Sequence, residues 1–125
     1  MEGSTTSFGE FIEEKRKLLG ISLRGLAAEL SIAPAYLSDI EKGRRYPPEK
    51  KLDEISKALK LSNVDTLLLY DLAALAKENS VSADLPEYIM QQDLARVALR
   101  RAKEVQLSEE GWKEVIDLIN KRKSE

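Results

Sequence analysis

The chain has 125 residues, of which 42% are hydrophobic and 34% charged, so it is long enough for one small packed domain with an appendage. It contains no Cys and no His, which excludes disulfides, thiol chemistry, histidine-based catalysis and nearly every zinc site. The net charge of −2 gives no overall attraction to nucleic acid, so any DNA binding must come from charge that is placed locally.

These exclusions favour a small α-helical binding protein over an enzyme. We expect no catalytic residues, no cofactor and no metal site. No apolar run approaches the roughly 20 residues that cross a bilayer. Met1–Glu10 also lacks the basic and then apolar pattern of a signal peptide, so we expect a cytoplasmic protein without membrane contact.

Gly and Pro divide the first half of the chain into four predicted helices. The first contains Phe8, Phe11 and Ile12 and ends at Gly20. Ser22 is placed to cap the second helix, and Pro34 opens the third, which runs to Gly43. A fourth helix, with apolar members Leu52, Ile55, Ala58 and Leu59, follows Pro47-Pro48. No useful strand-like alternation occurs, so the prediction is an all-α fold.

The second half has a different pattern. A helix capped by Ser62 or Asn63 contains residues 67–76, which are apolar on nearly every face, as in a helix buried on all sides or shared with a partner. Residues 79–85 are small and polar and predict a linker. Pro86 opens a helical segment through Glu104, and Ser108 starts the last helix. We predict a DNA-binding domain over 7–70, a helix end and linker over 71–85, and a C-terminal module over 86–125.

Two short helices separated by a tight turn, within Ser22–Gly43, have the outline of a helix-turn-helix. The small Ala27 lies where the two helices must cross. The apolar residues that would fix the crossing angle are Leu26, Ile32, Leu37 and Ile40. Lys42, Arg44 and Arg45 supply a basic flank after the second helix.

The segments Leu23-Arg24-x-Leu26-Ala27 and Tyr36-Leu37-Ser38-Asp39-Ile40-Glu41-Lys42-Gly43-Arg44-Arg45-x-Pro47 resemble the xenobiotic-response-element (XRE) family of bacterial and phage repressors. The resemblance covers about residues 7–70. It implies a five-helix lambda-repressor-like domain in a bacterial or phage protein, with residues 34–42 as recognition helix. It also implies a structural ion pair between Arg16 and Glu41.

Three positions depart from the family pattern. Ser31 stands where the turn usually has Gly, so it must take an unfavourable backbone angle or a different turn. Leu23 stands where many relatives have a Gln that contacts phosphate. The third helix begins with Ala33-Pro34-Ala35, where Pro34 and Ala35 offer no bidentate base contact.

We therefore expect affinity from phosphate contacts and modest base discrimination from Tyr36, Ser38 and Asp39. Tyr36 has the alternative of a packing role, and the arginines that of a solvated face. The expected DNA-contacting set is Ser22, Leu23, Arg24, Pro34, Ala35, Tyr36, Ser38, Asp39, Lys42, Arg44 and Arg45.

A helix-turn-helix normally reads two half-sites on double-stranded DNA as a two-fold dimer. The side chains expected to form a homodimer interface are Leu68, Leu72, Leu75, Leu94, Val97, Trp112, Val115, Ile116 and Ile119. In the alternative, these helices only fold back on the DNA-binding domain.

The leading interpretation is a dimeric, sequence-specific transcriptional repressor. One alternative is an antitoxin whose C-terminal helices bind a toxin while the first domain represses their operon. Another is an adaptor that does not bind DNA. The layout after Leu85-Pro86 also resembles repressors encoded beside a zinc metallopeptidase, which implies a regulatory protease as partner.

Overall fold

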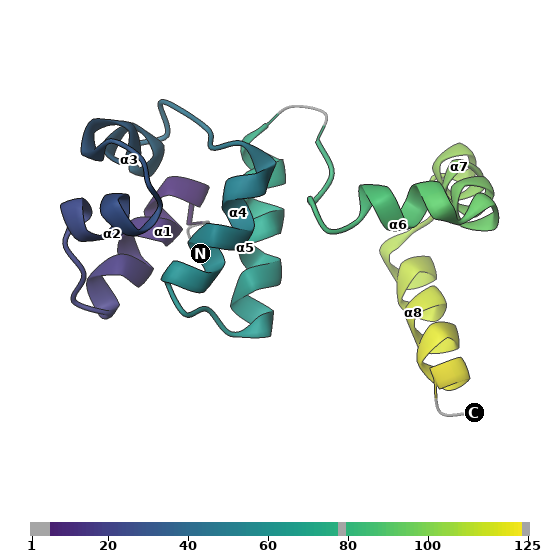
Figure 1. The fold of residues 1–125 in the computed structure, drawn as a ribbon. Helices are drawn as coiled ribbons and strands as arrows, with labels where there is room; N and C mark the ends of the chain where they lie inside the picture. The colour runs from purple at the N-terminus through teal and green to yellow at the C-terminus, as the bar shows by residue number, and fades with distance from the viewer. Residues whose placement is uncertain (1–5, 78–79, 124–125) are drawn as a thin grey trace. The chain divides into compact units, whose positions relative to one another are not determined.

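The computed structural model describes residues 6–77 and 80–123, and every regular element in these ranges is an α helix. In chain order the helices are α1 (Phe8–Leu18), α2 (Leu23–Glu29), α3 (Pro34–Glu41), α4 (Glu49–Ala58), α5 (Asn63–Ala76), α6 (Pro86–Gln91), α7 (Asp93–Val105) and α8 (Glu109–Lys123) (Figure 1). The chain divides into two compact units, one ending at Pro86 and one beginning at Glu87. None of the described helices is long and apolar enough to span a bilayer.

The first unit is a bundle of α1 to α5 around one apolar core (Figure 1). Each helix contributes side chains that are fully or almost fully buried. Those with the largest volume are Ile12, Leu26, Leu30, Leu37, Ile40, Ile55 and Leu69. Because α1 packs against both α3 and α5, and α2 packs against α3, the core holds the predicted helix-turn-helix as part of one bundle.

Local capping explains where these helices begin and end. Ser7 and Glu10 form a capping box at the start of α1. Gly20 has a φ of 70° after the end of α1, in the left-handed region that glycine enters at low cost. Lys51 Nζ donates to the carbonyl oxygen of Leu30 at 2.8 Å and so ties α4 to the end of α2.

A buried ion pair joins α1 to the end of α3. Arg16 Nε donates to Glu41 Oε2 at 2.8 Å, and Arg16 Nη2 donates to Glu41 Oε1 at 3.1 Å. Arg16 Nη1 also donates to the carbonyl oxygen of Ile21 at 3.0 Å. The hydrogen bond to Glu41, more than the charge of Glu41, raises the pKa of the Arg16 guanidinium, so the guanidinium stays charged in the folded protein.

The end of α5 and the segment after it belong to the packed first unit. The predicted helix end and linker over 71–85 includes Leu72, which is only 7% exposed and belongs to the core. Beyond α5, Ser82 is buried and its hydroxyl donates to the Asp71 carboxylate, while Ala83 packs on the core. This part of the chain folds back on the first unit because α5 offers it both a hydrogen-bond acceptor and apolar surface; residues 78–79 lie outside the described residues.

The predicted helical segment from Pro86 through Glu104 is interrupted at Gln92, which has φ −121° and ψ 95°. The Arg96 guanidinium donates to the carbonyl oxygens of Ile89 and Met90 at 2.9 and 2.7 Å. These carbonyls lie at the end of α6, where the Ile89 oxygen also accepts from the backbone N–H of Gln92 at 3.1 Å, so Arg96 adds to the bonds that stabilise the break. The prediction of one continuous helix was wrong there.

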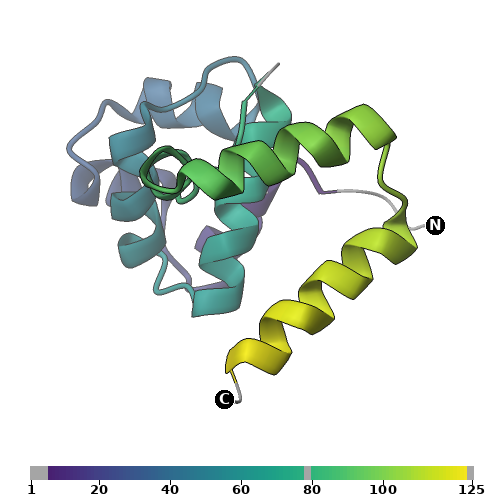
Figure 2. The same cartoon turned by 90° about the vertical axis from the view of Figure 1, so that its right-hand side faces the viewer.

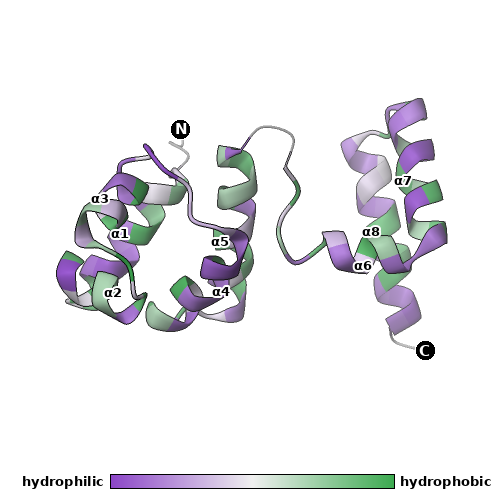
Figure 3. Cartoon of the chain, turned by 45° about the horizontal axis from the view of Figure 1, so that its top comes forward, coloured by the Kyte–Doolittle hydropathy of each residue, from purple (hydrophilic) through white to green (hydrophobic). Residues whose placement is uncertain are grey.

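The second unit is a set of helices without a core of its own. No described side chain of α6, α7 or α8 is buried. Gln106, with a φ of 53°, forms the turn after α7, and α7 and α8 leave this turn in different directions (Figure 2). Apolar and polar stretches alternate along both helices (Figure 3). Most large apolar side chains of this unit are therefore exposed in the single chain, and the rest are half-buried.

The Arg16–Glu41 pair gives a test of the fold. Glu41→Ala should lower the free energy of unfolding by about 3 kcal/mol, because Arg16 would be left buried without its carboxylate. Urea denaturation followed by circular dichroism measures the change. Glu13→Ala is the control, since Glu13 pairs with the exposed Lys17 on the surface of α1 and makes no hydrogen bond to Arg16 like those of Glu41, and should cost less than about 0.5 kcal/mol. Equal losses in the two variants would contradict the structural role of the buried pair.

Candidate nucleic-acid interface

The helix-turn-helix is built from α2, a tight turn and α3. Ser22 caps α2, its Oγ accepting from the backbone N–H of Gly25 at 2.9 Å. Ala27 is fully buried and small, which lets α2 and α3 pack closely, as the sequence requires. Ser31 adopts a φ of 57°, the unfavourable angle expected from the missing glycine. The N–H of the next residue, Ile32, donates to the Ala27 carbonyl oxygen at 3.0 Å and closes the turn.

The outer face of α3 carries the residues expected to read DNA. Pro34 occupies the first turn of α3, where its missing N–H costs nothing, and it is exposed together with Ala35. Tyr36, Ser38 and Asp39 are half-buried. The inner face, with Leu37, Ile40 and Glu41, is buried, so α3 presents one side to the core and one to solvent.

Tyr36 has the packing role that the sequence analysis gave as an alternative to DNA contact. Its ring packs against the apolar core, and its hydroxyl donates to the carbonyl oxygen of Tyr46 at 3.4 Å. The Arg45 guanidinium lies over the same ring, 5.8 Å from its centre. The ring thus supports the basic loop while part of it remains accessible.

The basic flank continues this exposed face. Lys42, Arg44 and Arg45 are all exposed. Asp39 Oδ1 lies 3.6 Å from Arg44 Nη1, and Asp39 Oδ2 lies 3.6 Å from Arg45 Nε. The arrangement gathers three cations and one carboxylate at the end of α3.

Of the three residues at the start of α2 that were expected to contact DNA, two are exposed and one packs on the core. Ser22 and Arg24 are exposed, but Leu23 is half-buried and packs against the core, so its side chain is committed to the fold. The exposed cation on α2 is therefore Arg24, next to the Ser22 cap.

The side chains expected to form a dimer lie on α5 and on α7 and α8. One of these side chains is buried. Leu72 is in the core, so a charge there would disrupt the first unit rather than test assembly. Leu68 and Leu75 lie on the outer side of α5, where Leu75 is 78% exposed. The remaining members are exposed or half-buried on α7 and α8: Leu94, Val97, Trp112, Val115, Ile116 and Ile119.

The sequence interpretation missed Gly9. A Cβ atom built on Gly9 would lie 2.4 Å from the carbonyl oxygen of Glu41 and 2.5 Å from that of Ile40. Only glycine allows α1 to approach the end of α3 this closely. The signal available in the sequence was a glycine directly after Phe8, inside an otherwise regular helical pattern.

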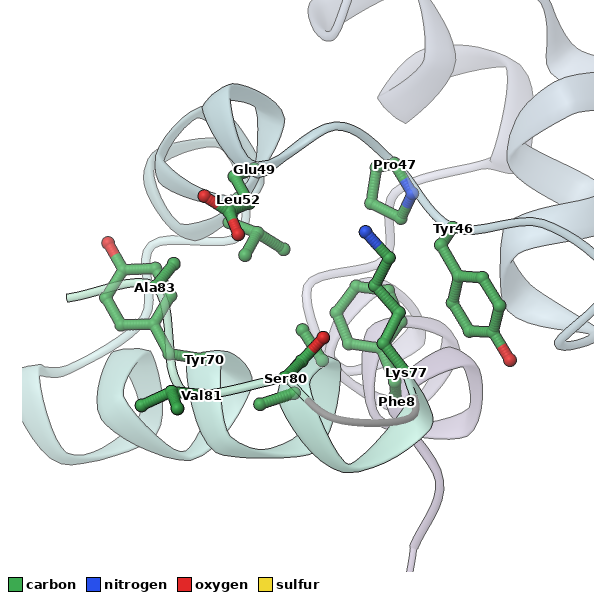
Figure 4. A pocket seen from close by; sticks show the side chains of 12 residues that line it. Phe8, Tyr46, Pro47, Glu49, Leu52, Tyr70, Lys77, Ser80, Val81 and Ala83 are labelled. Atoms are coloured by element: carbon green, nitrogen blue, oxygen red, sulfur yellow. The ribbon is translucent and has the colours of Figure 1, made fainter. Parts of the chain in front are cut away.

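A small pocket beside the interface is lined by α4, α5 and the segment after α5 (Figure 4). Phe8, Leu52 and Val81 give it an apolar lining, with Glu49 and Lys77 among its polar members. Tyr70 also lines it, and burial, followed by the charges of Asp53 and Asp84, raises the pKa of its phenol, so the hydroxyl stays protonated at neutral pH. No cluster of metal-ligating side chains lies anywhere in residues 6–77 or 80–123.

Comparison with known proteins agrees with this geometry. Residues 12–63 match the model of a family described as helix-turn-helix (HTH_3). This match confirms, over these residues, the resemblance to the XRE family. The chain is 39% identical over 54 residues to two proteins named uncharacterized HTH-type transcriptional regulators, from the CDC 1551 and H37Rv strains of Mycobacterium tuberculosis. The match covers 43% of this chain and 39% of each relative, so the chain spans well under half the length of the curated relatives it matches.

Two solved structures are also similar. The clp gene regulator ClgR from Corynebacterium glutamicum is 31% identical with a TM-score of 0.47, and the match covers 57% of this chain and 87% of that one. A complex of the SinR and SinI proteins is 27% identical with a TM-score of 0.44, over 94% of this chain and 99% of that one.

The strained turn of the helix-turn-helix domain gives a second prediction. Ser31→Gly should raise the free energy of unfolding by about 1 kcal/mol, because glycine adopts the left-handed conformation without the clash of a Cβ atom. Urea denaturation measures the change. Ser62→Gly is the matched control: Ser62 has a φ of −67° and caps α5, so this variant should lose stability. A loss in both variants would show that Ser31 is not strained.

Proposed function

We propose that this chain is a DNA-binding transcriptional regulator that acts as a dimeric repressor and reads paired half-sites with α3. The observation that carries the proposal is the exposed side of α3, which continues directly into Lys42, Arg44 and Arg45 within a helix-turn-helix domain. In this motif the second helix enters the major groove. The names of the curated relatives, transcriptional regulators, support the same function.

The residues on this face predict how much of the affinity comes from phosphate contacts and how much from base contacts. Arginine and lysine contacts to phosphates are independent of sequence and weaken as salt rises. Pro34 and Ala35 offer only apolar contact, such as to a thymine methyl group. Base discrimination then rests on Tyr36, Ser38 and Asp39, and Asp39 is suited to accept from the amine of cytosine. Most of the affinity of one half-site therefore comes from phosphates.

The phosphate contribution can be measured with a duplex that the protein selects from a randomised library. Arg44→Ala with Arg45→Ala should lower the slope of log affinity against log salt by about 2, since each phosphate contact contributes about one unit. Fluorescence anisotropy across a salt series measures this slope.

The matched control removes two positive charges elsewhere on the same unit. Lys17 and Lys57 are exposed and pair with acidic side chains one helical turn away on α1 and α4. Lys17→Ala with Lys57→Ala should leave the slope unchanged. Equal slopes in the two double variants would place the DNA contact elsewhere, and failure of the wild type to select any duplex would overturn the proposal. A repressor also lowers transcription from a promoter that carries the selected duplex, whereas an increase would indicate an activator.

We place the main dimer interface on α7 and α8. Isolated helices of about 12–15 residues are only marginally stable in water, and α7 and α8 have 13 and 15 residues. Most of their large apolar side chains, including Leu94 at 82% exposure, are exposed in the single chain. A second copy covers these side chains and sets two recognition helices at a fixed spacing. Leu68 and Leu75 on α5 form a smaller second surface.

Charged substitutions separate the two surfaces. Ile116→Glu should convert the protein to a monomer at concentrations where the wild type is dimeric, because a carboxylate would be buried in the α7–α8 interface. Leu75→Glu, on the outer side of α5, should leave the dimer intact. Sedimentation velocity measures both. A dimer that survives Ile116→Glu but not Leu75→Glu would move the interface to α5.

A further inference from the structure

Asp39 is a negatively charged residue on the outer side of α3, directly beside the basic flank of Lys42, Arg44 and Arg45. Its two carboxylate oxygens are shared between two arginines: Oδ1 lies 3.6 Å from Arg44 Nη1, and Oδ2 lies 3.6 Å from Arg45 Nε. The cations expected to bind phosphate therefore already face an anion within their own chain.

The backbone at the end of α3 produces this arrangement. Gly43 has a φ of 79°, and its N–H donates to the Ile40 carbonyl oxygen at 3.1 Å. The N–H of Arg44 donates to the Asp39 carbonyl oxygen at 2.8 Å. These two bonds form a Schellman turn, which folds the chain back over the last turn of the helix. Arg44 and Arg45 are thus brought to Asp39 by the turn itself, and the ring of Tyr36 lies under Arg45.

The pairs are loose enough to exchange partners. At 3.6 Å they are longer than hydrogen bonds, and the arginine side chains are 68% and 65% exposed. Solvent-exposed ion pairs of this kind are weak. A phosphate can therefore displace Asp39, but the displaced carboxylate then faces the DNA polyanion without its counter-ions.

We propose, on the basis of the function proposed above, that Asp39 is an internal counter-ion that holds Arg44 and Arg45 and thereby lowers affinity for DNA of unrelated sequence. On any duplex, transfer of the arginines to phosphates leaves the carboxylate in a repulsive field. A site that offers a base amine to Asp39 offsets this cost, and a site without one does not. Asp39 is in this way a specificity-determining residue that acts through the arginines.

The test compares two duplexes bound by the full chain: one that the wild type selects from a randomised library and one of scrambled sequence. Asp39→Asn should raise affinity for the scrambled duplex by about tenfold and steepen its salt slope by about one unit. Affinity for the selected duplex should change by less than about threefold, so the ratio of the two affinities falls. Fluorescence anisotropy across a salt series measures all four constants.

Two further variants test whether Asp39 acts through Arg44 and Arg45. Asp53→Asn removes the same charge from α4, where Asp53 pairs with Lys57 at 3.0 Å, and should leave the ratio unchanged. Asp39→Asn combined with Arg44→Ala and Arg45→Ala should show no gain over the arginine variants alone, because the gain depends on the released arginines. A gain that persists without the arginines, or an equal change on both duplexes, would overturn the role of Asp39 while leaving DNA binding intact. A wild type that selects no duplex would overturn both proposals.

Discussion

The close contact between α1 and the end of α3 sets the geometry of the whole proposed DNA-binding face. Gly9 lets the backbone of α1 approach the last carbonyls of α3, and Arg16 holds Glu41 with two hydrogen bonds at the same point. Arg16 also reaches the carbonyl oxygen of Ile21, just before α2. One buried guanidinium therefore connects α1, α3 and the segment that leads into α2, and the tilt of α3 depends on it.

The two carboxylates near the end of α3, Asp39 and Glu41, have different roles. Asp39 and Glu41 are two residues apart on the helix, a spacing that places side chains on different sides. Glu41 points into the bundle and is matched by Arg16, which has little freedom to move. Asp39 points outward and is matched by exposed arginines on a turn. The inner pair fixes the helix, whereas the outer group leaves its cations available to another anion.

The sequence predicted the parts of the fold that depend on local signals. Ser22, Pro34 and Gly20 each have a conformational or capping preference that acts within a few residues, and the structure has helix boundaries at all three. The burial of Leu72 could not be predicted, because α5 is apolar on nearly every side and periodicity does not identify the inner one. The break at Gln92 has no Pro or Gly beside it that would predict it from the sequence. It is stabilised by hydrogen bonds from Arg96 in the next helix. The pairing of Asp39 with two arginines, likewise, exists only once the turn at Gly43 has formed.

The two units also differ in where their stability comes from. The first unit has a core of its own, whereas α6 to α8 bury no described side chain, so folding of the second unit and assembly of the proposed dimer become one concentration-dependent event. Half-sites read largely through phosphates are individually weak, and linking two of them raises the effective concentration of the second contact. In the proposed repressor, the apolar faces of α7 and α8 would therefore help to set the affinity for the operator without touching it. Loss of the dimer would weaken binding even with every residue of α3 unchanged.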